Sequence, residues 1–115
     1  MSEDALLFIY TTVGDMEAAE KIATALVEPG LAACVNIYPG MRSVYRWQGK
    51  VEIDEEVSLF IKVPATLSVR AMEEVRRLHP YDVPALLEIP LGRVDGDYLT
   101  WAKEQTREQT RGQTG

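Results

Sequence analysis

Two long strand-forming segments joined by a tight turn constrain the fold of this chain more than any other feature. The segments, residues 32–47 and 50–63, flank Gln48-Gly49, where glycine supplies the positive φ that a tight turn requires. We therefore predict a β-hairpin with unusually long arms. In the second arm apolar and polar residues alternate, and one face carries Val51, Ile53, Val57, Leu59, Ile61 and Val63.

The first arm is too long for a compact domain of this size. Residues 32–47 would span about 53 Å at ~3.3 Å per residue. A compact domain of 115 residues has a radius of gyration of about 13 Å and hence a diameter of roughly 35 Å. Either the hairpin bends sharply at Pro39-Gly40, or its outer half projects and pairs with another subunit. Glu55 falls among the apolar positions of the second arm, so we also expect a bulge there or a charged partner across an interface.

The rest of the chain predicts an α+β fold. Apolar periodicity and turn residues predict a strand over 6–13, a helix capped by Asp15, a helix over 66–79, a strand over 85–91 and a short helix beginning near Asp95 or Asp97. With the hairpin, this is the βαββαβ order of ferredoxin-like folds, an antiparallel sheet with both helices on one face. We expect residues 1–103 to form this single domain. Residues 104–115 contain no apolar side chain and are expected to form a disordered tail.

One face of the predicted sheet has no partner within the chain. The first strand carries Leu7 and Ile9 on one side and Phe8 and Tyr10 on the other, so both of its faces are apolar. Two helices on the same side can cover only one of these faces. Because a large exposed apolar patch usually marks an interface, we predict an obligate homo-oligomer.

Charge and composition exclude several classes of partner. The formal net charge of -6 and the pI near 4.8 repel a phosphate backbone, so we expect no nucleic-acid partner. No apolar run approaches the ~20 residues that cross a bilayer, so we expect no membrane association. The single cysteine, Cys34, cannot form an intrachain disulfide, and the start of the chain is acidic rather than basic. These features favour a cytoplasmic location.

Four motifs in order, covering most of residues 6–103, resemble those of the CutA family of divalent-cation tolerance proteins. The motifs are Leu31-Ala32-Ala33-Cys34-Val35-Asn36-Ile37; the spaced residues Ser43, Tyr45, Trp47, Gly49, Lys50, Glu52, Glu56 and Lys62; His79-Pro80-Tyr81-Asp82-Val83-Pro84; and Asp97-Tyr98-Leu99-x-Trp101. The resemblance implies a ferredoxin-like subunit, a homotrimer with strand pairing between subunits, and a cytoplasmic setting. It also implies a link to copper and other divalent cations, with no obligatory cofactor. A similar trimer occurs in the PII-like nitrogen regulators, which bind small ligands in clefts between subunits.

The metal-ligand candidates are Cys34, His79 and Asp82. Thiolate and imidazole are suitable donors for copper or zinc, but a tetrahedral site needs about four ligands. Carboxylates or residues from several chains would therefore have to join them. The alternatives are that Cys34 is a small buried apolar residue and that His79 serves at the end of a helix. The family commonly has Glu after the second proline of its third motif, where this chain has Ala85.

A second hypothesis is a sensor that binds a small anionic ligand in a cleft between subunits. The ligand-cleft candidates are Tyr45, Trp47, Lys50, Glu52, Lys62 and Tyr81. Tyr45 and Trp47 could instead be interface anchors, because large amphipathic aromatic residues are enriched at interfaces. An enzyme that uses His79 or Asp82 as its acid/base group is a third hypothesis. The sequence contains none of the GxSxG, HExxH or P-loop motifs, so we expect no catalytic function.

Overall fold

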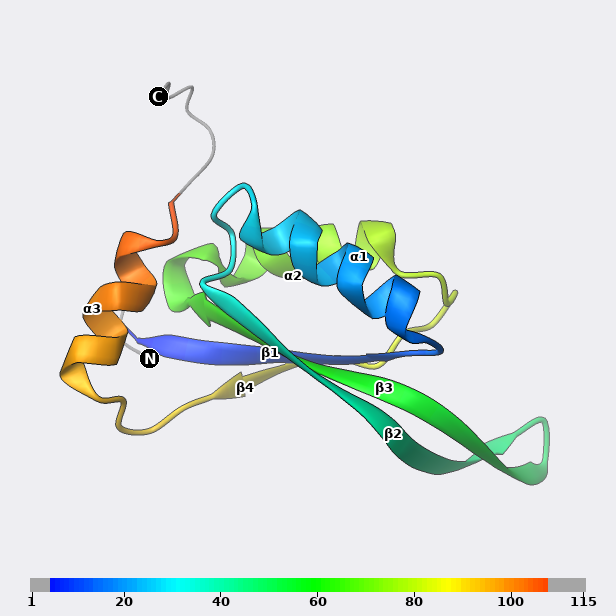
Figure 1. The fold of residues 1–115 in the computed structure, drawn as a ribbon. Helices are drawn as coiled ribbons and strands as arrows, with labels where there is room; N and C mark the ends of the chain where they lie inside the picture. Colours follow the sequence, from blue (N-terminus) through cyan, green and yellow to red (C-terminus); the bar gives the residue numbers. More distant parts are fainter. Residues whose placement is uncertain (1–4, 108–115) are drawn as a thin grey trace.

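The computed structural model describes residues 5–107 and is a mixed α/β fold of one antiparallel sheet and three α-helices (Figure 1). The elements in chain order are β1 (Leu6–Val13), α1 (Met16–Val27), β2 (Cys34–Trp47), β3 (Lys50–Pro64), α2 (Ser68–Leu78), β4 (Leu86–Pro90) and α3 (Gly96–Glu104). The strand order is β2-β3-β1-β4, and all three pairings are antiparallel. The predicted order of strands and helices is confirmed, and β4 is an edge strand that ends at Pro90.

Helices α1 and α2 lie on one face of the sheet, and the main core is between them and that face (Figure 1). Every second residue of β1 points into this core; Leu7, Ile9 and Val13 are at most 1% exposed. The same alternation runs along β3, because directly paired residues of antiparallel strands share a face. We call the other side of the sheet, away from α1 and α2, the open face.

The helix ends follow local side-chain chemistry. Asp15 caps α1, with its Oδ1 accepting a hydrogen bond of 2.8 Å from the backbone N–H of Ala18. Asp95, rather than Asp97, caps α3 in the same way. Helix α2 is shorter than the predicted range of 66–79. A 3₁₀ turn over Ala65–Leu67 precedes it, and His79 has extended backbone because Pro80 follows.

The long hairpin both projects from the rest of the sheet and is irregular near Pro39-Gly40. The principal extents are 48 × 31 × 21 Å and the radius of gyration is 15.1 Å, because the outer part of β2 and β3 projects past the rest of the sheet (Figure 1). The strands are also irregular between Tyr38 and Met41, where β2 contains one residue more than β3. Gly40 in this bulge has a φ of +81°. We call the paired residues beyond the bulge, 41–56, the outer half of the hairpin.

The bulge changes which residues of β2 share a face. Tyr38 is paired with Ser58, whereas Met41 is paired with Glu56, so even-numbered residues before the bulge and odd-numbered residues after it lie on the open face. Glu55 keeps the alternation of β3 and lies opposite Arg42 on the exposed outer half. The prediction of a bulge at Glu55 is therefore wrong, and the cross-strand neighbour of Glu55 is the oppositely charged Arg42.

Helix α3 closes one end of the sheet. Ala102 packs with Leu6 and Ala33 in a second small core. After the helix ends at Glu104, the backbone N–H of Arg107 donates to the carbonyl oxygen of Gly30 at 2.9 Å. Residues 108–115 of the predicted tail lie outside the described residues. No helix within residues 5–107 is both long and apolar enough to cross a bilayer.

Candidate functional site

Cys34 lies on the open face of the sheet. It is the first residue of β2 and pairs with Lys62 of β3, which in turn pairs with Phe8 of β1. The thiol is half-buried and free. Cys34 is therefore presented to the side of the sheet that α1 and α2 leave uncovered.

His79 lies in a different place and already has a partner at each ring nitrogen. Its Nδ1 accepts from the backbone N–H of Tyr81 at 3.1 Å, so Nε2 carries the proton and donates to the carbonyl oxygen of Thr12 at 2.8 Å. The side chain is buried. Because Thr12 is about 13 Å along β1 from Phe8, one subunit does not bring His79 to Cys34.

Asp82 follows in the same loop and is exposed. Its backbone carbonyl accepts from Arg76 Nη2 at 3.3 Å. Among residues 5–107 no group of three or more His, Cys, Asp and Glu side chains is arranged to hold a metal ion. A site built from Cys34, His79 and Asp82 would therefore need more than one subunit or a rearranged loop.

The buried position of His79 predicts a pH dependence of stability. Burial and the nearby Arg76 lower its pKa from the ordinary 6.5, and the Thr12 carbonyl and Glu56 only partly oppose this. The unfolded chain therefore takes up the proton first, so stability is full above about pH 6.5 and falls as the pH decreases. In urea unfolding from pH 7.5 to 5, we expect wild type to lose more stability than His79→Gln. Equal slopes for the two proteins would contradict this assignment.

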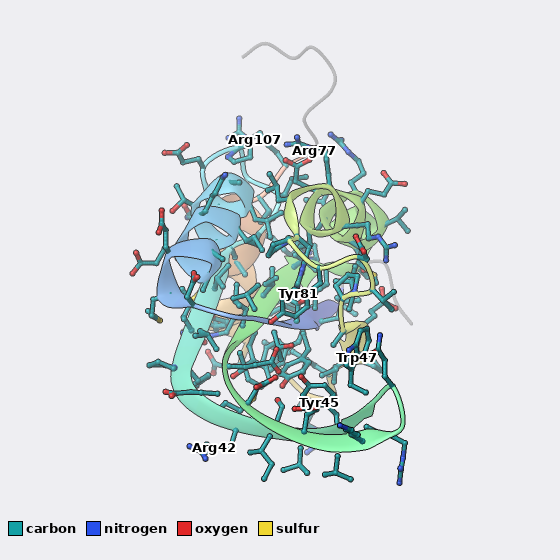
Figure 2. All side chains as sticks on the ribbon, turned by 90° about the vertical axis from the view of Figure 1, so that its right-hand side faces the viewer. Arg42, Tyr45, Trp47, Arg77, Tyr81 and Arg107 are labelled. Atoms are coloured by element: carbon teal, nitrogen blue, oxygen red, sulfur yellow. The ribbon has the colours of Figure 1, made fainter. Side chains whose placement is uncertain are left out.

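Two tyrosines donate to two carboxylates beside the base of the hairpin's outer half. Tyr81 OH donates to Glu56 Oε2 at 2.8 Å, and Ser43 Oγ donates to Glu56 Oε1 at 2.6 Å. Diagonally across the same two strands, Tyr45 OH donates to Asp54 Oδ2. Figure 2 shows Tyr81, from the loop after α2, above Tyr45 of β2. We call these five residues the phenol–carboxylate cluster.

Both phenols of the cluster are protonated at neutral pH. Burial and the Glu56 carboxylate raise the pKa of Tyr81 to about 12. The hydrogen bond to Asp54 raises the pKa of Tyr45 to about 12 as well. The tyrosines therefore act as hydrogen-bond donors, and both oxygens of Glu56 already have partners. The cluster links the loop after α2 to the hairpin.

The six ligand-cleft candidates from the sequence divide into two groups. Trp47 pairs with Lys50 and Tyr45 with Glu52 on the outer half, and Tyr81 approaches them through its contact with Glu56. Lys62 lies about 20 Å further along β3 from Glu56, at ~3.3 Å per residue. It therefore does not join the other five candidates within one subunit.

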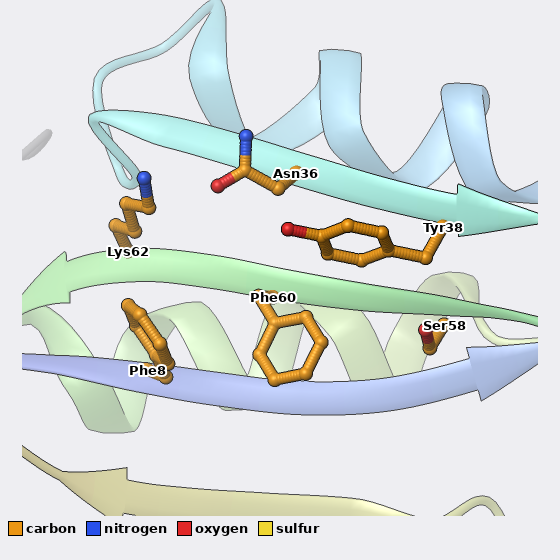
Figure 3. Close-up of a pocket in the computed structure, with 6 residues that line it drawn as sticks. All are labelled: Phe8, Asn36, Tyr38, Ser58, Phe60 and Lys62. Carbon is orange, nitrogen blue, oxygen red and sulfur yellow. The ribbon is translucent and has the colours of Figure 1, made fainter.

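A pocket of about 430 Å³ lies on the open face, around Lys62 (Figure 3). Figure 3 shows Lys62 and Ser58 at its two ends, with Phe60 between them. Of the residues that line this pocket, only Lys62 is among the ligand-cleft candidates predicted from the sequence. The alternation of Ser58, Phe60 and Lys62 along β3 was the available signal, since these three must share a face. The lining residues are Phe8, Asn36, Tyr38, Ser58, Phe60 and Lys62.

Comparison with known proteins gives consistent results. The model of the family described as CutA1 divalent ion tolerance protein matches residues 7–105. The chain is 45% identical over 98 residues to the divalent-cation tolerance protein CutA of Thermus thermophilus, covering 85% of this chain and 95% of that protein. It is 44% identical over 101 residues to the chloroplastic protein CutA of Arabidopsis thaliana, covering 88% of this chain and 56% of that protein. This chain therefore spans about half the length of the plant relative.

The fold agrees with this sequence similarity. The solved structure of the divalent cation tolerance protein from Thermus thermophilus matches with a TM-score of 0.83 at 43% identity. The match covers 89% of this chain and 99% of that chain. The family model and the bacterial relative each match most of the chain. The chain therefore belongs to the CutA1 family of divalent ion tolerance proteins.

Proposed function

We propose that this protein is a cytoplasmic homotrimer that acts in divalent-cation tolerance, copper in particular, by binding metal ions without catalysis. The observation that carries the proposal is the apolar and aromatic surface that one subunit leaves exposed on the hairpin and the open face. A second copy of this chain is the partner that the surface fits, because within residues 5–107 the strands of the outer half have unpaired lateral edges that another copy can complete. The single domain that assembles in this way comprises residues 1–103.

The outer half of the hairpin supports assembly most directly. Val44, Val51 and Ile53 share one face, and their side chains are 65%, 64% and 58% exposed. Trp47, 59% exposed, lies on the other face of the same segment. Three β-branched residues and a tryptophan on a projecting segment form a surface that usually marks an interface. Within residues 5–107 one edge of β2 and one edge of β4 also lack a strand partner, so their backbone groups are available to a neighbouring copy.

Assembly offers a way to complete a metal site. Cys34 lies on the open face, so copies that meet on this face can each contribute one thiolate, a donor suited to Cu(I) and Zn(II). His79 and Asp82 are candidates for a second, weaker position at the loop. His79 can bind a metal only after it gives up Tyr81 N–H or Thr12 O, which lowers the affinity expected there.

A cation titration tests the metal part of the proposal. We expect the reduced protein to bind Cu(I), measured by competition with a chromogenic chelator, and Cys34→Ser to weaken this binding at least about tenfold. His79→Gln and Asp82→Asn should each have a smaller effect. Asp97→Asn, which removes one carboxylate from the first turn of α3, is the matched control for Asp82→Asn.

The outcomes separate the candidate ligands. Unchanged Cu(I) affinity in Cys34→Ser would contradict the role of the thiol. A loss in Asp97→Asn as large as that in Asp82→Asn would mean that general negative charge attracts the cation, and not Asp82 itself. The titration is repeated with Zn(II) and Cu(II), so that the preference of the site between soft and harder ions is measured as well.

A further inference from the structure

The outer half of the hairpin joins the rest of the sheet at a point where the backbone allows bending. In the described part of the chain the pairing of β3 with β1 ends at Val57, and from Glu56 onward β3 pairs with β2 alone. At the same level β2 has the extra residue of its bulge, where Gly40 has a φ of +81°. A bulge bends a strand, and two-stranded ribbons twist more than wider sheets. Backbone pairing therefore constrains the direction of the outer half less than that of the four-stranded part.

A side chain from outside the hairpin reaches across this point. Tyr81 OH donates at 2.8 Å to Oε2 of Glu56, the first residue of β3 beyond the pairing with β1. Figure 2 shows Tyr81, from the loop after α2, above the hairpin. A weaker contact joins Tyr10 OH to Met41 Sδ at 3.5 Å, because a thioether is a poor acceptor. We call the hydrogen bond from Tyr81 to Glu56 the latch.

The loop end of the latch is fixed by the body of the subunit. The backbone N–H of Tyr81 donates to His79 Nδ1 at 3.1 Å, and His79 Nε2 donates to the carbonyl oxygen of Thr12 at 2.8 Å. The rings of His79 and Tyr81 are 4.8 Å apart. The phenol oxygen also passes close to the end of β1, because a Cβ atom at Gly14 would lie 3.6 Å from it. Tyr81 is therefore positioned by β1 and by the end of α2, and it transmits their position to Glu56.

We propose that the latch couples the loop over residues 79–84 to assembly of the protein. The closed latch holds the outer half in the direction in which it meets a neighbouring copy, so less freedom is lost on association. Such a coupling is reciprocal, so assembly in turn holds the loop that carries His79 and Asp82. This inference rests on the proposed assembly through the outer half, and it adds a residue outside that half that controls it.

A direct contact of Tyr81 with the neighbouring copy is the alternative to the latch, because this side chain is 38% exposed. The two roles differ in their dependence on Glu56. The latch needs the carboxylate of Glu56 as its acceptor, whereas a direct contact with another copy does not. A double-mutant cycle over Tyr81 and Glu56 therefore separates the two roles.

Sedimentation velocity over a dilution series measures the concentration at which half of the protein is assembled. We expect Tyr81→Phe to raise this concentration at least about fivefold, because it removes the donor of a charge-assisted hydrogen bond and keeps the ring. Glu56→Ala should have at least as large an effect, and Tyr81→Phe should add little to it. Ser43→Ala is the matched control, because it removes the other donor to Glu56 from within the hairpin. It should change the concentration by less than about twofold.

Hydrogen exchange measures the reciprocal effect on the loop. Residues 81–83 carry exchangeable backbone amides between two prolines, Pro80 and Pro84. Ile53→Asp, which is expected to be monomeric, provides the dissociated subunit. The amide of Tyr81 should exchange at least about threefold more slowly in the assembled wild type than in Ile53→Asp. In Tyr81→Phe, at a concentration at which it is still assembled, this difference should disappear, and an unchanged circular dichroism spectrum shows that the variant is folded.

Three results would overturn the inference while the proposed assembly stands. The first is assembly of Tyr81→Phe at the wild-type concentration. The second is a full effect of Tyr81→Phe in the Glu56→Ala background, which would mean that the hydroxyl acts on the neighbouring copy. The third is equal exchange of the loop amides in the assembled and dissociated protein. A wild-type protein that stays monomeric over the whole dilution series would instead overturn the proposed assembly, and the latch with it.

Discussion

Replacing Ile53 by aspartate is expected to leave the protein monomeric. Ile53 is mostly exposed in one subunit, so the substitution costs little within the fold. In an assembly that buries the outer half, it would place an unpaired carboxylate in an apolar contact. That typically costs about 3–5 kcal/mol, a loss of roughly a hundred- to several-thousand-fold in association at each interface. Sedimentation velocity at micromolar concentration measures the change in mass.

A matched substitution outside the hairpin controls for the added charge. Val69 on α2 is 69% exposed, and Val69→Asp should leave the assembly intact. Trp47→Ala should also weaken assembly more than it weakens folding of the subunit. A wild-type protein that sediments as a monomer, or an Ile53→Asp protein that keeps the wild-type mass, would contradict assembly through the outer half.

The second large effect is expected in the core. Ile61 of β3 is 0% exposed and lies on the face covered by α1 and α2. Ile61→Ala should lower the free energy of unfolding by about 2–5 kcal/mol, because it removes buried methyl groups and leaves a cavity. Urea denaturation followed by circular dichroism measures this difference at one fixed protein concentration.

Ile53→Ala provides the comparison, because Ile53 and Ile61 lie on the same strand and their side chains point to the same side of it. Within one subunit Ile53→Ala should cost less than about 1 kcal/mol. If the outer half is an interface, the loss of unfolding free energy in Ile53→Ala should increase with protein concentration. The loss in Ile61→Ala should be present in the dissociated subunit as well. Similar costs for the two substitutions in a monomeric state would contradict the burial difference along β3.

Much of the fold could be predicted because local and long-range signals agree. The β1 strand has the predicted bounds, and Gln48-Gly49 forms the turn with positive φ at both residues. Asp15 caps α1 as expected. The start of α2 was predicted too early, because a 3₁₀ turn after Pro64 satisfies the same apolar pattern as a first helical turn. Its end was placed one residue late, at His79, which the following proline keeps extended.

The irregularity at Pro39-Gly40 was expected from the length of the first arm, but the position of Glu55 was not. Glu55 keeps the alternation of β3, and it is tolerated among apolar positions because this part of the hairpin is exposed in one subunit. The structure has the extra residue at Pro39-Gly40, where glycine adopts a positive φ, and it leaves Glu55 opposite Arg42. Which arm contains the extra residue depends on pairing with β1 and on the core beneath it. Those contacts are distant in the sequence.

The candidate residues could be recognised individually, but their grouping could not. The loop after α2 brings Tyr81 to Glu56, which is 25 residues away in the sequence, and no short motif encodes that contact. The sequence left open whether His79 serves at a helix end or takes part in a binding site. The structure shows both ring nitrogens bonded within the subunit, a tertiary arrangement that spacing along the chain does not reveal.

The extra residue at Pro39-Gly40 has a consequence for how this protein can evolve. A shift of one residue turns every following side chain of a strand to the opposite face of the sheet. In β2 the extra residue separates an inner stretch, which pairs with β3 and packs against α1, from the exposed outer half. Substitutions in the inner stretch are limited by that packing, whereas those on the outer half change only the exposed surface of the hairpin. This surface can therefore change in evolution while the core of the subunit stays intact.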